Sequence, residues 1–290
     1  MDRMRVRTDL ALEARESFEG SDTEVHGVVV EEQYEEDLDL KITRVKILSE
    51  RGAREMGKPV GTYLTLEAPG MAVPDEDYHR EISEALAKCL KELAGEWKDR
   101  SVLVVGLGNR DVTPDALGPK AVSNLMITRH LFREYGREAM GMEQASAVSG
   151  IAPGVMAQTG METLEIIQGV IDQTSPDLLV VIDALAARST RRLGRTIQLT
   201  DTGIQPGSGV GNHRGSLTRE SLGIPVIAIG VPTVVEAAAI IYDAQGSCER
   251  MPPHLNSMFV TPKNIDEMIK QLSFTLSEAL NMVFQLPGHA

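Results

Sequence analysis

Three short, nearly continuous apolar runs constrain the fold of this 290-residue chain more than any other feature. They cover residues 102–107, 178–182 and 226–229. Strands that are buried on both faces of a parallel sheet have this pattern, because helices cover both of their sides. Segments with helical spacing lie between and beyond the runs, at 116–134, 163–174, 234–243 and 264–284. This alternation predicts an α/β fold with three layers and a mainly parallel sheet.

The N-terminal third has a different pattern of apolar residues. This pattern predicts an additional β-rich portion at about residues 20–75. Apolar and polar residues alternate at 25–31, 38–48 and 62–66, which indicates strands. A helix is expected at 77–97, capped by Asp75 or Asp77. The first twenty residues are polar and charged, so we expect a loosely held arm with a short helical stretch at 10–17.

Composition limits the classes of function. The formal net charge of −13 argues against binding nucleic acid through phosphate contacts, which need a basic face. No run approaches the roughly 18 apolar residues of a membrane span, and the first residues lack the apolar core of a signal peptide. Cys89 and Cys248 do not form a disulfide framework, and Cys89 falls on a predicted helix as a core residue. We therefore expect a cytoplasmic protein without membrane contact.

The first apolar run ends in the turn "GLGNRDVTPDALGP". A dinucleotide-binding turn would need a third glycine where Asp111 stands, and no phosphate-binding loop with its lysine is present. Gly106 and Gly108 allow a close approach of the backbone at this turn. Asp115, or Thr113, can be explained as a cap of the following helix. The other interpretation makes Asp115 a functional carboxylate and Asp111 a turn residue.

A second carboxylate, Asp183, follows the apolar run "LLVVI". Ligands of α/β sheets bind at the carboxyl ends of the strands, so Asp115 and Asp183 are expected to converge on one cleft. Two neighbouring carboxylates cannot both ionise easily, and such a pair divides the roles of acid and base. Alternatively, the two bind a divalent metal ion that activates water. A purely structural role for Asp183 stays open.

Two further polar segments are candidates with plain alternatives. The loop at 200–215 can hold a substrate backbone or a developing oxyanion, or can be a flexible connection, and its central glycines are Gly207, Gly209 and Gly211. His213 lies in the same loop, where a single histidine is usually solvated. A basic cluster after Asp183 is interpreted as a solvated helix face, and its members are Arg188, Arg191 and Arg192.

Several long stretches together resemble one known family. They are "VRTDLALEARE", "VVGLGNRDVTPDALGPKAVSNLMITRHLF", "APGVMAQTGMET", "IDALAARS", "DTGIQPGSGVGN" and "GIPVIAIGVPTVVEA", and the likeness resumes at "FVTPKNIDEMI". The chain is similar to the spore germination proteases of endospore-forming bacteria, which degrade the small acid-soluble spore proteins that coat DNA. That family is in turn related in fold to the hydrogenase-maturation endopeptidases.

The resemblance implies a self-processing endopeptidase made as a zymogen. The matching positions are Asp115 and Asp183 as an acid pair that needs neither metal nor cofactor, with self-cleavage between Asp9 and Leu10. Residues 1–9 would then be a self-cleaved prosegment and residues 10–290 a single peptidase domain. The resemblance further implies small acid-soluble spore proteins as substrates, a homotetramer and a location in the forespore or spore core. The region 242–258 departs from larger family members, which carry a long insertion there.

Two other functions stay open at this point. One is a metal-dependent endopeptidase of the hydrogenase-maturation type. The other is a non-enzymatic α/β module that uses the same loops to bind a small ligand.

Overall fold

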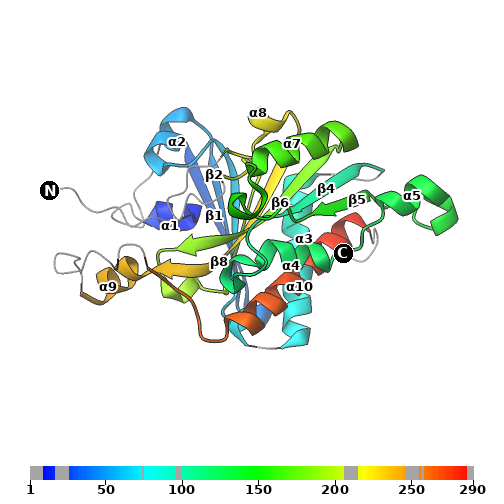
Figure 1. The fold of residues 1–290 in the computed structure, drawn as a ribbon. Helices are drawn as coiled ribbons and strands as arrows, with labels where there is room; N and C mark the ends of the chain where they lie inside the picture. Colours follow the sequence, from blue (N-terminus) through cyan, green and yellow to red (C-terminus); the bar gives the residue numbers. More distant parts are fainter. Residues whose placement is uncertain are drawn as a thin grey trace.

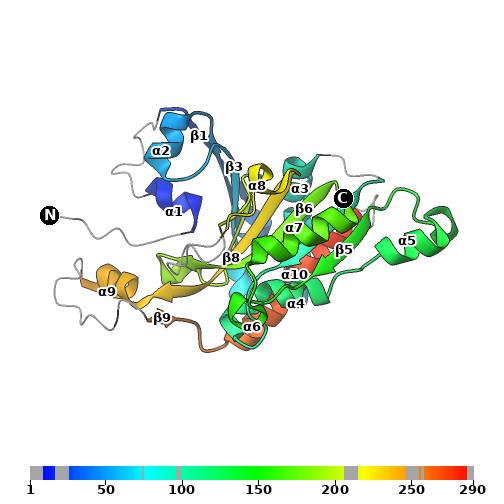
Figure 2. The same ribbon diagram turned by 45° about the horizontal axis from the view of Figure 1, so that its top comes forward.

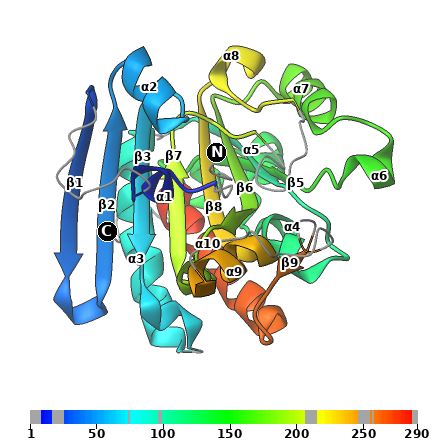
Figure 3. The ribbon, with the colours of Figure 1, turned by 90° about the vertical axis from the view of Figure 1, so that its left-hand side faces the viewer.

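The computed structural model describes residues 9–16, 26–73, 75–95, 99–205, 215–245, 255 and 258–285. Within these ranges nine strands form one sheet in the order β1-β2-β3-β7-β8-β6-β4-β5, with β9 paired to β8 (Figure 3). The strands are β1 (Val28–Glu35), β2 (Leu40–Ile47), β3 (Gly61–Glu67), β4 (Ser101–Gly106), β5 (Ala147–Ile151), β6 (Leu178–Ala187), β7 (Thr196–Thr200), β8 (Val226–Glu236) and β9 (Phe259–Val260).

Helices lie on both sides of this sheet (Figures 1 and 2). They are α1 (Ala11–Glu16), α2 (Glu50–Met56), α3 (Glu76–Ala94), α4 (Leu117–Ser123), α5 (Arg129–Tyr135), α6 (Met156–Thr159), α7 (Thr163–Thr174), α8 (Arg219–Leu222), α9 (Ala237–Gln245) and α10 (Ile265–Phe284). None of the helices in the described ranges is long and apolar enough to cross a membrane.

The half of the sheet made of β8, β6, β4 and β5 is parallel, and it is the part that the apolar runs predict. Successive residues of β4 enter opposite cores: Val104 packs with α3, α4 and α10, whereas Val105 packs with α7. Because both faces are covered, each strand is apolar throughout. The predicted three-layer α/β architecture is confirmed.

The other half is antiparallel and extends the same sheet through β7, β3, β2 and β1. The predicted β-rich N-terminal portion is therefore joined to the parallel strands edge to edge, which makes the sheet mixed. Leu64 and Leu66 of β3 pack in the core of α3 and α10. The opposite face carries a smaller cluster in which Ala11 of α1 and Met56 of α2 contact β2 and β3.

Several elements differ from the sequence-based prediction. The single helix expected at 116–134 is two helices, α4 and α5, because the intervening Thr128 hydrogen-bonds to Val148 of β5 in both directions. The strands β5 and β7 and the helix α2 were not predicted. The helix expected at 234–243 begins only at Ala237, since β8 continues to Glu236 and pairs with β6 and β9.

Candidate active site

The turn after β4 is held together by close contacts of glycine backbone. A Cβ atom on Gly106 would lie 2.2 Å from the carbonyl oxygen of Gly118, so the strand end and the start of α4 touch directly. Gly108 has φ +110°, and a Cβ atom there would lie 1.9 Å from the carbonyl oxygen of Asp115. These positions allow the 3-10 turn Thr113–Asp115 to fold back against the end of β4.

Asp115 is fixed within this turn and does not cap α4. The N-cap residue of α4 is Ala116, and no side chain caps this helix, so the capping interpretation of Asp115 and Thr113 is wrong. Instead, the backbone N–H of Asn109 donates to Asp115 Oδ2 at 2.7 Å. Asp115 is half-buried and lines the cleft described below.

Asp111 lies on the outside of the same turn and is exposed. Its backbone N–H donates to Asn109 Oδ1 at 3.0 Å, the local bond of an Asx turn. Gln158 of α6 donates to both Asn109 Oδ1 and Asp111 Oδ2, at 3.0 and 3.3 Å. Asp111 thus has the contacts of a turn residue, and it is not among the residues that line the cleft.

Asp183 occupies the point where β6 loses its neighbour on one side. Ile182 pairs with Gly106, the last residue of β4, while Asp183 itself pairs with Gly230 of β8. The strand does not end at Asp183, as the sequence suggested, but continues to Ala187 because β8 still pairs with it. Asp183 is only 7% exposed, and its Oδ1 accepts the N–H of Ala184 at 2.9 Å.

One cleft of about 980 Å³ brings the predicted acids together. Asp115 and Asp183 line it from the ends of β4 and from β6, and Asp9 of the N-terminal segment lines it as well. Lys58, Tyr63 and Gln198 are further lining residues. Burial raises the pKa of Tyr63 to about 12, although hydrogen bonds with Thr202 and Thr200 oppose that shift. Asp115, Asp183 and Asp9, the residue before the expected cleavage position, therefore line one cavity.

The N-terminal segment Asp9–Glu16 is docked, which corrects the expectation of a loosely held arm for these residues. Residues 1–8 and 17–20 of the expected arm fall outside the described residues. Asp9 and Ala186 of β6 exchange two bonds: the N–H of Asp9 donates to the carbonyl of Ala186, and the N–H of Ala186 donates to Asp9 Oδ2. Leu10 is fully buried and packs with Leu185 and Val235. The local sequence gave no sign of this, since the partners lie far along the chain.

The side chains of Lys58 and Gln198 hydrogen-bond to the backbone around the Asp9–Leu10 peptide. Lys58 Nζ donates to the carbonyl oxygen of Asp9 at 2.8 Å, and Gln198 Nε2 lies 3.4 Å from the same oxygen. Gln198 Oε1 accepts the N–H of Ala11 at 2.6 Å. Removal from water lowers the pKa of Lys58, and the carboxylates of Asp9 and Glu13 oppose this lowering.

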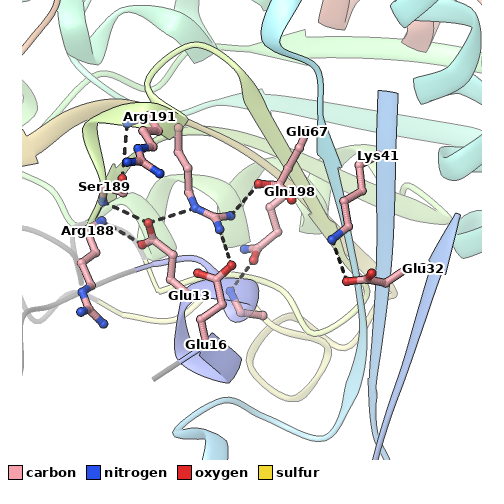
Figure 4. Close-up of polar contacts among 11 residues, drawn as sticks. Glu13, Glu16, Glu32, Lys41, Glu67, Arg188, Ser189, Arg191 and Gln198 are labelled. Carbon is pink, nitrogen blue, oxygen red and sulfur yellow. Dashed lines mark hydrogen bonds and ion pairs between the residues drawn. The ribbon is translucent and has the colours of Figure 1, made fainter. Parts of the chain in front are cut away.

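The carboxylate of Glu13 is enclosed beside the end of β6 (Figure 4). It accepts the backbone N–H groups of Arg188 and Ser189 at 2.8 and 3.1 Å. Arg192 Nε lies 3.3 Å from Glu13 Oε1, and the same guanidinium pairs with Glu16 at 2.7 Å and with Glu67 at 3.2 Å. The interpretation of the basic cluster as a solvated face is therefore wrong for Arg192, which is buried.

Other candidates have simpler outcomes. Cys89 is buried on α3, and burial raises the pKa of its thiol to about 12, which agrees with a core residue. Among the described residues there is no group of three or more His, Cys, Asp and Glu side chains that could hold a metal ion. Part of the region 242–258 falls outside the described residues. So does part of the glycine-rich loop, with Gly207, Gly209, Gly211 and His213.

Sequence reasoning missed Lys58, Gln198 and Arg192 as members of this site. Gln198 had one usable signal, because it is a polar residue in the middle of the short strand "TIQLT". Lys58 follows the helix α2, whose C-cap is Gly57, and no motif marks it.

Comparisons with known proteins show which family this chain resembles. A family model described as "Germination protease" matches residues 6–248. The chain is 48% identical to a germination protease of Caldanaerobacter subterraneus subsp. tengcongensis, over 98% of this chain and 95% of that protein. It is 43% identical to a germination protease of Clostridium perfringens, over 97% and 95% of the two chains. A solved [NiFe] hydrogenase maturation protease, HycI from Thermococcus kodakarensis, is 18% identical with a TM-score of 0.35, covering 68% of this chain and 99% of that one.

Proposed function

This chain belongs to the germination protease family and is an endopeptidase, and from that premise we propose that it first cleaves its own Asp9–Leu10 bond. Residues 1–9 are then a prosegment, and residues 10–290 are the mature peptidase. The substrates that we propose for the mature enzyme are the small acid-soluble spore proteins of the germinating spore. We further propose that it acts in the spore core as a homotetramer.

One observation carries this proposal: Asp9 lies in the cleft that Asp115 and Asp183 line. Asp9 binds along β6 beyond Asp183 through its pair of bonds with Ala186. The residues on the other side of the bond are anchored too, since Leu10 is fully buried and Glu13 is enclosed by Arg192. A segment bound on both sides of one peptide bond, in a cleft that two acids line, has the arrangement expected of a substrate.

The chemistry that we propose for the two acids is hydrolysis by an activated water. One carboxylate accepts a proton from water, whose oxygen attacks the carbonyl carbon of Asp9. The other acid gives a proton to the nitrogen of Leu10 as the C–N bond breaks, so the products are a carboxyl group at Asp9 and an amine at Leu10. Two interacting carboxylates titrate as a pair, and the division of roles belongs to the pair.

Sequencing of the N-terminus of the incubated, purified chain tests the proposal. We expect Leu10 to become the N-terminal residue of the wild type, and the original N-terminus to persist in Asp115→Asn and in Asp183→Asn. Cleavage at Leu10 in both variants would contradict the assignment of the pair. Incubation with a chelator separates the metal-dependent alternative: we expect an unchanged rate, whereas loss that a divalent metal restores would favour that alternative.

A further inference from the structure

The carbonyl oxygen of Asp9 accepts a hydrogen bond from a charged side chain. Lys58 Nζ donates to it at 2.8 Å, so a cationic group contacts the oxygen of the peptide bond proposed for cleavage. Lys58 reaches this point from the turn after α2, where Gly57, with φ +64°, ends the helix in the left-handed conformation. The contact joins the antiparallel half of the sheet to the cleft of the parallel half.

Gln198 of β7 aligns the same peptide from a second side. Its Oε1 must be the acceptor of the Ala11 N–H at 2.6 Å, because only the carbonyl end of the amide accepts. The amide nitrogen is then left facing the Asp9 carbonyl oxygen at 3.4 Å. Gln198 thus spans the Asp9–Leu10 bond, with the carbonyl oxygen of Asp9 and the N–H of Ala11 as its two partners.

Attack of water on the Asp9 carbonyl carbon would move negative charge onto this oxygen. A donor already aimed at the oxygen stabilises the transition state more than the ground state, and a cation in a water-poor site does so strongly. The direction of the hydrogen bond from Lys58 to Asp9 also distinguishes an oxyanion-binding lysine from a lysine that acts as a general base. A general base would face water or a nucleophile, whereas Lys58 donates to the carbonyl oxygen.

We propose that Lys58 is a catalytic residue that binds the oxyanion formed at Asp9, and that Gln198 positions the peptide for it. The proposal rests on the self-cleavage proposed above. Water adds to the carbonyl carbon, the negative charge gathers on the oxygen at Lys58, and the carbonyl reforms as the bond to Leu10 nitrogen breaks. Lys58 keeps its proton throughout. Burial lowers the pKa of Lys58, and the carboxylates of Asp9 and Glu13 oppose part of that lowering.

The same geometry applies to a protein substrate that occupies the place of the N-terminal segment. The residue before the scissile bond of the substrate would present its carbonyl oxygen to Lys58. The backbone N–H of the residue two positions later would donate to Gln198. Recognition through backbone groups is independent of the side chains of the substrate, so the role of Lys58 extends to every bond that the enzyme cuts.

The test compares full-length wild type with Lys58→Met, and uses Lys46→Met on β2 as the matched control, since Lys46 does not line the cleft. The rate of Leu10 appearance is measured by intact mass. Hydrogen exchange of residues 10–16 reports whether the segment stays docked, and exchange in α3 and α10 reports the fold. We expect Lys58→Met to cleave on the order of 100-fold more slowly with the segment still protected, and Lys46→Met to cleave as the wild type does.

Two results would overturn the role of Lys58. One is that Lys58→Met cleaves itself at a rate within about threefold of the wild-type rate. The other is a slow rate accompanied by loss of protection in residues 10–16, which would make Lys58 a docking residue. Failure of the proposed function itself looks different, because the wild type would then not cleave, or Asp115→Asn and Asp183→Asn would.

Discussion

Glu13 and Arg192 form an ion pair that is almost closed to solvent. Arg192 Nε lies 3.3 Å from Glu13 Oε1, and the two side chains are 10% and 2% exposed. The pair links the N-terminal segment to the 3-10 turn Thr190–Arg192 after β6. The backbone N–H groups of Arg188 and Ser189, just before that turn, also donate to the carboxylate. Glu13, the fourth residue after the proposed cleavage position, is therefore held by named contacts, as the backbone around the Asp9–Leu10 bond is.

Arg192→Met tests this link. The change leaves the buried Glu13 carboxylate without its cation, and removes the partner of Glu16 and Glu67 as well. Breaking a buried pair by removing one member costs about 3–5 kcal/mol, so we expect a loss of about 3 kcal/mol or more in the free energy of unfolding. Self-cleavage should slow because the segment no longer stays in the cleft.

The matched control is Arg191→Met, one residue away and exposed. Denaturant unfolding of the two variants measures the difference. Equal stabilities of Arg191→Met and Arg192→Met would contradict the buried pair as the anchor of the segment.

Gly106→Ala tests the close contact that places Asp115. The new methyl group would lie 2.2 Å from the carbonyl oxygen of Gly118, and this backbone atom cannot move alone. Overpacking of this kind costs about 1–3 kcal/mol of stability, and the displaced turn should also slow self-cleavage. Gly169→Ala is the control, since Gly169 lies within α7 with open space around its Cβ position.

Thermal unfolding and intact-mass measurements separate the two glycine variants. Gly169→Ala should raise the free energy of unfolding by about 0.5–1 kcal/mol, because alanine favours a helix interior. It should leave the cleavage rate unchanged. If Gly106→Ala cleaved at the wild-type rate, the tight turn would not be needed to position Asp115.

His79 predicts a pH dependence of stability. Burial lowers the pKa of its imidazole, while Asp75 and the backbone near Val73 oppose the shift, and Nδ1 bonds to Thr275 Oγ1 at 2.8 Å between α3 and α10. A group with a lowered folded-state pKa contributes stability that is present above its unfolded pKa of about 6.5. That contribution is lost as the pH falls through the folded-state value.

Melting temperatures of the wild type and His79→Gln between pH 8 and pH 5 measure this effect. The stability advantage of the wild type over the variant should shrink as the pH decreases. A difference that is constant over this range would show that His79 does not titrate differently in the folded and unfolded states.

Local sequence patterns predicted three of the parallel strands and the helix between two of them. The runs at 102–107, 178–182 and 226–229 became β4, β6 and β8, and the helix predicted at 163–174 has the bounds of α7. Asp115 and Asp183 line one cleft because Asp115 lies in the turn after β4, and Asp183 follows Ile182, which pairs with the last residue of β4. The strands β5 and β7 are too short to stand out from the sequence around them.

Lys58, Gln198 and Arg192 could not be predicted, for a different reason. Their contacts with Asp9 and Glu13 depend on how the antiparallel strands β3 and β7 join the parallel strands, which is a long-range pairing. The docked state of residues 9–16 depends on the same pairing. The segment mixes apolar and charged residues, and Leu10 and Ala11 are buried by partners that lie far along the chain.

Residues 9–16 are docked in the cleft of their own chain, so we expect each acid pair to cut the chain that carries it. Mixing isotopically heavy Asp183→Asn chains with light wild-type chains, and following both by intact mass, tests this expectation. Only the light chain should lose residues 1–9, with a half-time that does not depend on total protein concentration. Loss of the same residues from the heavy chain at a similar rate would contradict it.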